Sequence, residues 1–291
     1  MSTDVRPVFS GHETFQCRHL WLKKGYDYIK AGKSFGADDA VVNLGVGKNM
    51  VTSIRYWMRA FDLSEGGDKM TAFADAIFSD NGGHDPYLED DASLWLLHYH
   101  LVRKGYATSY NLIFNEFRKE RVEFTKEAFV RFIRTKSESD TSFTFNQNTI
   151  ESDFDVFVKL YVGTETSKDK EEIVSGIFPE LNLIRVIQRE KQATLYHIET
   201  NEKASIPEEV ILYAIVTDPE IGLSVNLETL ENGYNSVGAI LGINRTGLVD
   251  KIERLCAKYP GLVYKDDAGI RELQFKKKPT WVQVLKDYYG K

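Results

Sequence analysis

The strongest constraint on what this chain can fold into lies in its C-terminal part, where helical periodicity and turn residues alternate. The segment from Asn244 to Lys258 repeats apolar residues at helical spacing, with Asn244 or Thr246 as its cap. Gly242-Ile243 forms the turn before this helix. Three shorter helices are expected upstream, at Pro207 to Val216, Asn226 to Leu230 and Ser236 to Leu241.

A β-hairpin is expected after that helix. Leu262 to Lys265 and Ile270 to Phe275 are the strands, and Asp266-Asp267-Ala268-Gly269 is the turn between them. The order helix, turn, helix, hairpin predicts a winged-helix domain. Because winged helices bind either DNA or other proteins, both functions stay open. The residues predicted to contact DNA here are Arg245, Lys251, Arg254, Lys276 and Lys277.

A second pair of helices is expected near the N-terminus. A short helix from Ala37 to Leu44 precedes the turn Gly45-Val46-Gly47, and Asn49 is expected to cap a helix that ends near Phe61. Two helices joined by a tight glycine-containing turn indicate a helix-turn-helix, with an ordinary helical hairpin as the alternative. The residues predicted to contact phosphates and base edges are Lys48, Asn49, Thr52, Ser53, Arg55 and Arg59.

Composition sets the class of protein. The 291 residues are 42% hydrophobic and 27% charged, as is usual for a globular protein of two or three domains. We predict a mainly α fold with small β elements (α+β), divided into a helix-turn-helix-like region at 1–65, a mostly helical region at 66–200 and a winged-helix-like domain at 201–291. With no long apolar run and only two distant cysteines, a cytoplasmic protein without a membrane segment is expected.

Charge is unevenly distributed along the chain. The net charge is −6, yet residues 101–136 hold nine Lys or Arg against four Glu, and residues 271–291 hold six against two acids. Such segregation permits a basic face on an acidic protein, and random clustering on a solvated surface is the alternative.

The segment from Phe9 to Lys24 is rich in residue types that are common in catalytic and binding sites. His12 and Glu13 are candidates for acid–base catalysis or metal binding. Arg18, Lys23 and Lys24 are candidates for clamping phosphate. In the alternative, structural reading, His12 or Thr14 caps a helix from Arg18 to Ile29 and the basic residues are a solvated face.

A group of carboxylates is the other candidate for catalysis. Asp85, Glu89 and Asp90 precede a helix that contains His98 and His100. Such a set suits Mg²⁺ or Mn²⁺ in phosphodiester cleavage. The alternative is that Asp85-Pro86 starts a helix, with Asp at the cap and Pro in the first turn.

Three segments resemble a known family. Phe9 to Gly25, Leu44 to Trp57 (LGVGKNMVTSIRYW) and Asp85 to Leu101 (DPYLEDDASLWLLHYHL) are similar to a bacterial domain-of-unknown-function family that includes the SspB-like component of Ssp DNA phosphorothioation systems. The resemblance implies a partner set of a cysteine desulfurase, an ATPase and an adenylating sulfur-transfer protein, which together replace a non-bridging phosphate oxygen with sulfur. It also implies an association with DNA nicking.

These inferences lead to one leading hypothesis and two alternatives. The leading hypothesis is a component of an anti-phage phosphorothioation system that binds double-stranded DNA and is a candidate strand-nicking endonuclease. His12, Glu13, Asp85, Glu89 and Asp90 are then the candidate catalytic residues. The first alternative is a non-enzymatic adaptor that docks the sulfur-transfer enzymes or the ATPase. The second is a transcriptional regulator of a defence operon.

Overall fold

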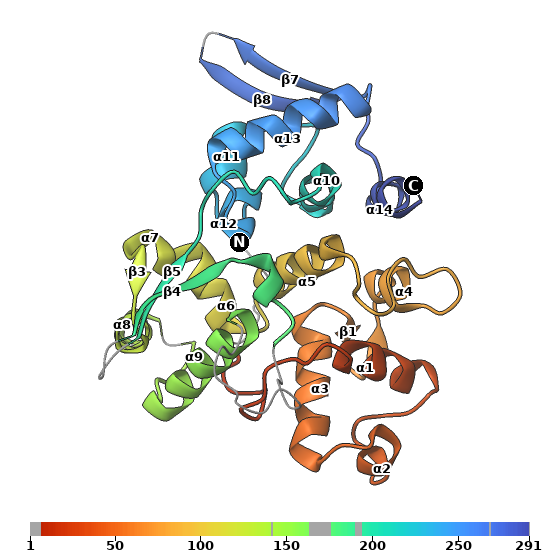
Figure 1. Cartoon of the computed structure of the whole chain (residues 1–291), viewed down its shortest axis with the longest axis vertical. Helices are drawn as coiled ribbons and strands as arrows, with labels where there is room; N and C mark the ends of the chain where they lie inside the picture. The colour runs from red at the N-terminus through yellow and green to blue at the C-terminus, as the bar shows by residue number, and fades with distance from the viewer. Residues whose placement is uncertain (1–6, 141, 163–175, 190–193, 268, 291) are drawn as a thin grey trace. The chain divides into compact units, whose positions relative to one another are not determined.

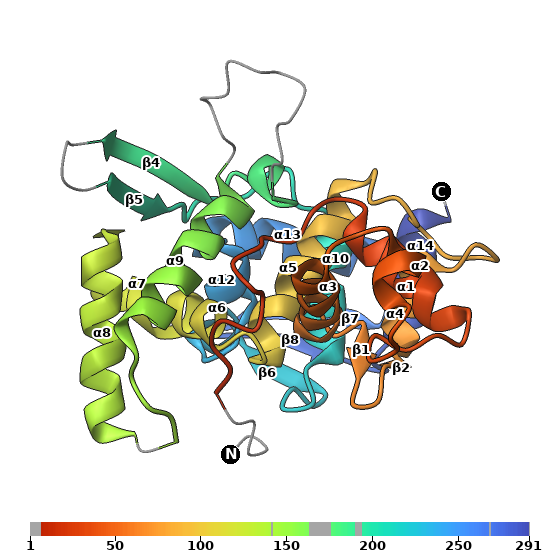
Figure 2. The same cartoon turned by 90° about the horizontal axis from the view of Figure 1, so that it is seen from below.

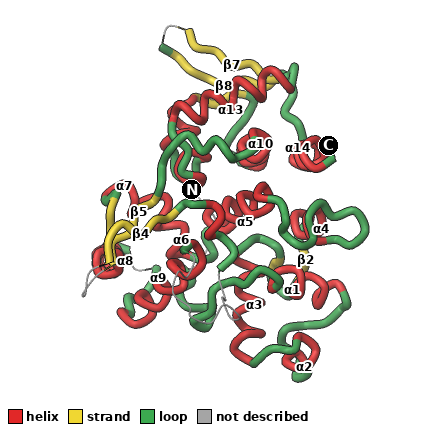
Figure 3. The backbone as a smooth tube through the Cα atoms, in the orientation of Figure 1, coloured by secondary structure: helices red, strands yellow, loops and turns green. Residues whose placement is uncertain are grey.

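The structure, a computed structural model, describes residues 7–140, 142–162, 176–189, 194–267 and 269–290. Helices predominate, and the strands of the described residues form three small antiparallel sheets (Figure 3). The expectation of an α+β fold is therefore confirmed. The chain divides into two compact units, which we call unit 1 (residues 1–89 and 100–198) and unit 2 (residues 90–99 and 199–291).

Unit 1 contains mostly short helices. They are α1 (Trp21–Lys30), α2 (Ala40–Leu44), α3 (Lys48–Ala60), α4 (Ala72–Phe78), α6 (Thr108–Leu112), the π-helix η1 (Ile113–Phe117), α7 (Arg118–Glu120), α8 (Lys126–Ser139), α9 (Gln147–Tyr161) and the 3₁₀-helix η2 (Pro179–Leu181). α5 (Asp91–Lys104) supplies its residues from His100 onward to this unit. The strands are β1 (Ser64–Glu65), β2 (Lys69–Met70), β3 (Glu123–Phe124), β4 (Ile184–Arg189) and β5 (Thr194–Ile198).

Helices α2 and α3 form the pair expected from the sequence. Gly45 ends α2 with a φ of +62°, a conformation that glycine adopts without steric cost. The N-cap of α3 is Gly47, so the prediction that Asn49 caps this helix is wrong. On its buried side α3 packs against α1, where Gly25 approaches Ile54 and Met58 so closely that a Cβ would lie 2.8 Å from the Met58 sulfur. The glycine thus permits the close crossing of the two helices.

Helix α9 resolves an ambiguity of the sequence. By its sequence the apolar run from Phe154 to Tyr161 fits a strand or a helix, and in the structure it belongs to α9. The N-cap of this helix is Asn146, whose side chain accepts a hydrogen bond from the Thr149 amide at 3.0 Å. Helix α8, capped by Thr125, packs beside α9, as Figure 2 shows. In the small sheet of unit 1, β5 lies between β3 and β4. The three elements α8, α9 and this sheet enclose an aromatic core that includes Phe124, Phe129 and Phe154.

Unit 2 contains helices and one three-stranded sheet. Its elements after the start of α5 are α10 (Glu208–Thr217), β6 (Ser224–Asn226), α11 (Leu227–Asn232), α12 (Val237–Leu241), α13 (Arg245–Lys258), β7 (Leu262–Asp267), β8 (Ile270–Phe275) and α14 (Trp281–Tyr289). The hairpin β7–β8 and the helix α13 before it are visible in Figure 1. The strand order is β6-β8-β7, so β6 adds a third strand that the sequence did not lead us to expect.

Caps and one glycine fix helix α13. The Asn244 side chain accepts a hydrogen bond from the Gly247 amide at 2.9 Å, which confirms Asn244 rather than Thr246 as the cap. A Cβ on Gly247 would lie 2.2 Å from the Glu202 carbonyl oxygen. Glycine at position 247 therefore permits the close approach of the first turn of α13 to the Glu202 backbone.

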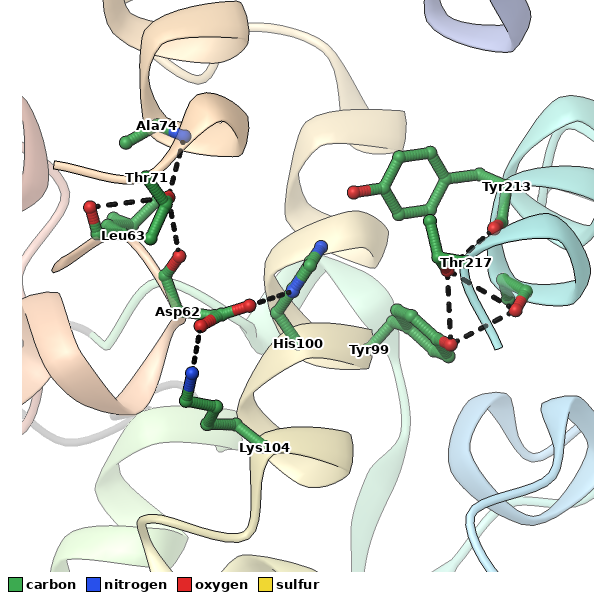
Figure 4. A network of polar contacts seen from close by, with 10 residues as sticks. Asp62, Leu63, Thr71, Ala74, Tyr99, His100, Lys104, Tyr213 and Thr217 are labelled. Atoms are coloured by element: carbon green, nitrogen blue, oxygen red, sulfur yellow. Dashed lines mark hydrogen bonds and ion pairs between the residues drawn. The ribbon is translucent and has the colours of Figure 1, made fainter. Parts of the chain in front are cut away.

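The unit 2 part of α5 is buried and hydrogen-bonded within that unit. The Tyr99 hydroxyl donates to the Ala214 carbonyl at 3.0 Å and lies 3.3 Å from the Thr217 hydroxyl (Figure 4). The His98 ring bonds the Ile240 carbonyl at 2.8 Å. These hydrogen bonds tie α5 to α10 and α12. Among the described residues, no helix is both long and apolar enough to cross a membrane.

Candidate functional site

A strained turn near the N-terminus contains the first predicted site residues. Ser10, Glu13 and Thr14 have φ values of 57°, 50° and 68°, in the left-handed region that non-glycine residues rarely adopt. The turn is closed by hydrogen bonds from the Glu13 amide to the Ser10 carbonyl and from the Phe15 amide to the His12 carbonyl, at 3.3 and 2.9 Å. Strain of this kind persists only where surrounding interactions hold the backbone.

His12 lies beneath this turn and is 1% exposed. Its Nε2 is 2.9 Å from Oδ1 of Asp153, and its Nδ1 accepts a hydrogen bond from the Thr14 amide at 3.2 Å. Because Nδ1 accepts, the proton of the neutral ring lies on Nε2, which donates to Asp153. The Trp57 ring stacks on the imidazole at a centroid distance of 6.2 Å. His12 is thus a buried member of a hydrogen-bonded pair.

Asp153 connects the turn to the rest of unit 1 through hydrogen bonds. Its carboxylate is 2% exposed and also accepts hydrogen bonds from the Ser10 amide and the Ser109 hydroxyl, both at 2.6 Å. The indole nitrogen of Trp57 donates to the Phe15 carbonyl at 3.0 Å. The turn is therefore held by α9 and α3, and Ser109 of α6 bonds the same Asp153 carboxylate.

The turn does not start a helix. Helix α1 begins at Trp21 with Leu20 as its N-cap, so the expectation that His12 or Thr14 caps it is wrong. Glu13 is exposed on the surface of the turn. Glu13 is therefore accessible to solvent, whereas the His12 ring is enclosed.

Two of the carboxylates predicted to be catalytic, Asp85 and Asp90, accept hydrogen bonds from nearby backbone amides. Asp85 is 7% exposed and accepts the Glu89 amide at 2.9 Å, in a turn rather than at the predicted helix start. Asp90 accepts the Ala92 amide at 2.8 Å at the start of α5, and it belongs to unit 2, whereas Asp85 and Glu89 belong to unit 1. Within the residues that the structure describes, no group of three His, Cys, Asp or Glu side chains could hold a metal ion. The side chains present therefore do not fit a Mg²⁺ or Mn²⁺ centre of that kind.

Two lysines of α1 that were predicted to contact DNA already have hydrogen-bond partners within the chain. Lys23 is buried, and its Nζ lies 2.5 Å from Asp27 and 2.7 Å from Asp80. Burial alone would lower the pKa of Lys23, but the two carboxylates outweigh it and raise the pKa. The expectation that Lys23 clamps phosphate therefore conflicts with its burial between two acids. Lys24 is exposed and donates to the Leu44 carbonyl at 3.0 Å.

Arg18 is stacked rather than ion-paired. Its guanidinium lies 5.1 Å from the centroid of the Trp21 ring, as in a cation–π interaction. Its Nε is buried and has no hydrogen-bond partner among the described residues.

The residues predicted on α3 differ in their accessibility. Lys48, Asn49 and Thr52 are exposed, as expected. Ser53 is fully buried and its hydroxyl is 3.5 Å from the Phe15 carbonyl, so the prediction of an exposed Ser53 is wrong. The helix turns this side chain toward the N-terminal loop, a face that the sequence pattern did not separate from the solvated one.

Arg55 and Arg59 share one carboxylate. Asp68, which is 7% exposed, lies 2.8 Å from Nε of Arg55 and 3.6 Å from Nη2 of Arg59. A phosphate at this face would therefore meet two guanidinium groups and one opposing charge.

The basic residues of α13 are matched by acids or buried. Arg245 lies 2.6 Å from both Glu228 and Glu231 of α11. Lys251 is 2% exposed and donates to the Ala204 carbonyl at 3.0 Å, which places it away from any DNA surface, in conflict with its prediction. Arg254 pairs with Asp250 at 3.1 Å, and Lys258 pairs with Glu209. The exposed face of this helix is thus close to electrically neutral.

The three lysines that follow the hairpin differ in their contacts. Lys276 and Lys277 are exposed, and no acidic partner for either is found among the described residues. Lys278 instead donates to the Ile221 carbonyl at 2.6 Å. Two of the predicted DNA-binding residues in unit 2 therefore have unpaired charges.

Asp62, shortly before β1, interacts with two basic side chains. Asp62, with a φ of 57°, lies 3.3 Å from Nδ1 of His100 and also pairs with Lys104 (Figure 4). Its backbone carbonyl accepts the Thr71 hydroxyl at 2.8 Å. Burial by itself would raise the pKa of Asp62, but the interactions with His100 and Lys104 lower it. The network joins α3 to the unit 1 end of α5.

A groove that the sequence analysis missed lies between η1–α7 and α8. It encloses about 310 Å³ and is lined in part by Glu116, Phe117, Glu120, Arg121, Arg131 and Phe132. The signal in the sequence was the excess of basic residues between 101 and 136, which did not identify which of them come together. A π-helical turn such as η1 is rare and is found often at functional sites.

Comparison with known proteins identifies relatives of the whole chain. A family model described as a protein of unknown function, DUF4007, matches residues 9–289. The crystal structure of magnesium ion-bound SspB is similar, with a TM-score of 0.85 and 30% identity over 97% of this chain and 88% of that one. A second SspB crystal structure gives a TM-score of 0.83 and 29% identity, covering 99% and 91%. No curated protein matches the sequence.

Proposed function

Because this chain belongs to the DUF4007 family, we propose that it is a DNA-binding component of a DNA phosphorothioation system. The observation that carries the proposal is the correspondence with SspB along nearly the whole chain, which suggests a component of the Ssp system. Such systems exchange an oxygen of the DNA phosphate for sulfur. A component that handles their DNA must therefore approach the anionic sugar–phosphate backbone.

Exposed cations without acidic partners support binding to that backbone. Lys48, Lys276 and Lys277 were predicted to bind DNA, and Arg121 and Arg131 join them. Among the described residues, none of the five side chains has an ion-pair partner. A phosphate that approaches them displaces only solvent and counterions, which makes phosphate binding dependent on salt.

Unit 2 favours a second role in the same system. We infer that it is a winged helix, because α10, β6, α11–α12, α13 and the hairpin β7–β8 follow one another in the order typical of that fold. Its helix α13 has ion-paired or buried basic residues instead of a positive face. This observation favours a surface that docks a protein, such as the cysteine desulfurase, the ATPase or the adenylating enzyme of the system.

Strand nicking stays a prediction. One of the similar SspB structures contains magnesium, whereas the described carboxylates here form no cluster of three. We therefore assign no catalytic step to Glu13, Asp85, Glu89 or Asp90. Relaxation of supercoiled plasmid in the presence of Mg²⁺ or Mn²⁺ and the partner proteins tests the activity directly, and a persistently supercoiled plasmid contradicts it.

The proposed function is tested by the salt dependence of DNA binding. Fluorescence anisotropy with duplex and single-stranded oligonucleotides is measured between about 50 and 200 mM salt, a range over which proteins that bind several phosphates lose affinity steeply. We expect log K to fall linearly with log salt. An affinity that does not change with salt, or no binding at the lowest salt, contradicts the proposal.

The docking role requires a separate test. Co-purification of the chain with each sulfur-transfer partner, without any DNA shift at low salt, favours the adaptor. A promoter-specific footprint would instead favour a transcriptional regulator.

A further inference from the structure

The groove between η1–α7 and α8 has the chemistry of a nucleotide site. Its floor contains Phe117, which is 1% exposed, and the half-buried Phe132, with ring centroids 5.1 Å apart. Arg121 and Arg131 are exposed along its rim. The groove therefore places the half-buried Phe132 ring beside two cationic groups, within a volume of about 310 Å³ that lies at the lower end for small-ligand sites.

The charges of the groove leave its two arginines available. Lys136 pairs with Glu116 at 2.6 Å, which satisfies one of the two carboxylates in the groove. Arg121 and Arg131 have no side-chain partner within the described part of the chain, and Glu120 is the one carboxylate left to oppose them. The local charge is positive, whereas the protein as a whole carries −6.

A second hollow continues the basic surface along α8. Its charged lining residues are Lys126, Glu127, Arg131, Arg134 and Glu151, and Lys126 pairs with Asp155 at 2.9 Å. Arg131 lines both hollows. The Arg134 guanidinium is held 4.9 Å from the Phe145 ring centroid and donates to Gln147 at 3.0 Å. Residues three apart on a helix are neighbours, so Arg131 and Arg134 present adjacent charges. Arg121, Arg131 and Arg134 are thus exposed cations with no ion-pair partner among the described residues, which suits contact with the phosphates of a DNA strand.

The geometry points to a site for an unpaired stretch of DNA, with one base against Phe132 and the flanking phosphates at Arg121 and Arg131. Aromatic surfaces beside a cationic groove bind single strands because every base has a face that stacks, whatever its sequence. In a duplex the faces of the bases are covered by their stacked neighbours, so a duplex can bring its phosphates to the arginines but no base face to Phe132. This inference rests on the proposed function, since it names the form of DNA that unit 1 takes.

The test is binding of a fluorescent single-stranded oligonucleotide by the full chain, with the matching duplex measured in parallel. Arg121→Gln and Arg131→Gln each remove an unpaired exposed charge, and Phe132→Leu keeps an apolar side chain but removes the aromatic face. The control is Lys159→Gln, a lysine of α9 outside the groove that carries the same change of charge. Thermal unfolding of each variant checks that it folds.

We expect the double variant Arg121→Gln/Arg131→Gln to bind the single strand on the order of 10-fold more weakly. Its salt dependence should be shallower by about 0.7 for each phosphate that is no longer neutralised. Phe132→Leu should weaken single-strand binding on the order of 10-fold and change duplex binding little. Lys159→Gln should bind like the unchanged protein.

The binding results distinguish a failure of the groove site from a failure of the proposed function. If the unchanged protein binds DNA and the double arginine variant binds the single strand equally well, the groove is not the site and the proposed function stands. A Phe132→Leu variant that folds and binds the single strand fully would overturn the stacking of a base. If the unchanged protein binds neither form of DNA, the proposed function fails, and the groove site fails with it.

Discussion

Removing the carboxylate of Asp153 should destabilise unit 1 strongly. In Asp153→Ala the Ser10 amide, the His12 ring and the Ser109 hydroxyl lose a shared acceptor that is 2% exposed. Each buried donor left without a partner costs about 1–3 kcal/mol. Because water can enter the space vacated by the side chain, we expect a total loss of about 3–5 kcal/mol, a large part of the roughly 5–15 kcal/mol that stabilises a typical domain.

The isosteric variant separates charge from shape. Asp153→Asn keeps one oxygen that can accept from Ser10 and His12, so it should cost only about 1–2 kcal/mol, through loss of charge-assisted hydrogen bonds. The matched control is Asp155→Asn on the same helix. That carboxylate is half exposed and pairs with Lys126, so its removal should cost about 0–1 kcal/mol.

Urea unfolding followed by circular dichroism measures these differences as shifts of the midpoint at constant m-value. We interpret the pair of His12 and Asp153 as a structural clasp. DNA binding by Asp153→Asn should therefore match the unchanged protein wherever the variant is folded. An Asp153→Ala midpoint equal to that of the unchanged protein would refute the clasp. If the unchanged protein relaxes supercoiled plasmid and a fully stable Asp153→Asn does not, the pair of His12 and Asp153 takes part in the chemistry instead.

Three further predictions concern other parts of the chain. Asp62→Asn should destabilise unit 1 by about 1–2 kcal/mol at pH 7; because the pKa of Asp62 is lowered in the fold, this difference should be constant at neutral pH and shrink below about pH 4. A difference in urea midpoint that persists undiminished at pH 3 would contradict the ion pairs with His100 and Lys104. Gly247→Ala should destabilise unit 2 by about 2–3 kcal/mol, because its Cβ would meet the Glu202 backbone, whereas Gly222→Ala, with open space around it, should change thermal stability little. Equal effects of the two substitutions would refute the close approach. Glu228→Gln/Glu231→Gln should raise DNA affinity on the order of 5-fold by releasing Arg245; unchanged affinity in anisotropy would show that these acids do not keep α13 from DNA.

The sequence allowed good prediction of local structure in unit 2. The helix starts at Ser236 and Asn244 and the hairpin around Gly269 depend on neighbouring residues, and all three were found. Strand β6 was missed because it is three residues long with a single buried apolar residue, Val225. Its existence depends on pairing with β8, far along the chain.

The candidate site was harder to predict because its residues are distant in sequence. Asp153 lies 141 residues from His12, so no local pattern connects them. Lys23 is expected to be solvated from its local sequence, because one of its two carboxylate partners, Asp80, lies 57 residues further along the chain. The excess of basic residues between 101 and 136 was visible, but the choice of Arg121 and Arg131 as the unpaired ones depends on the pairing of Lys136 with Glu116.

We propose that DNA is held by arginines without an acidic partner, and not by the arginines of α13, which pair with acids. The most direct test compares the slopes of log K against log salt for single-stranded DNA in two double variants, Arg121→Gln/Arg131→Gln and Arg245→Gln/Arg254→Gln. We predict that the first pair flattens the slope by about 1.4 and that the second leaves it unchanged. A slope that flattens only when Arg245 and Arg254 are removed would contradict the claim.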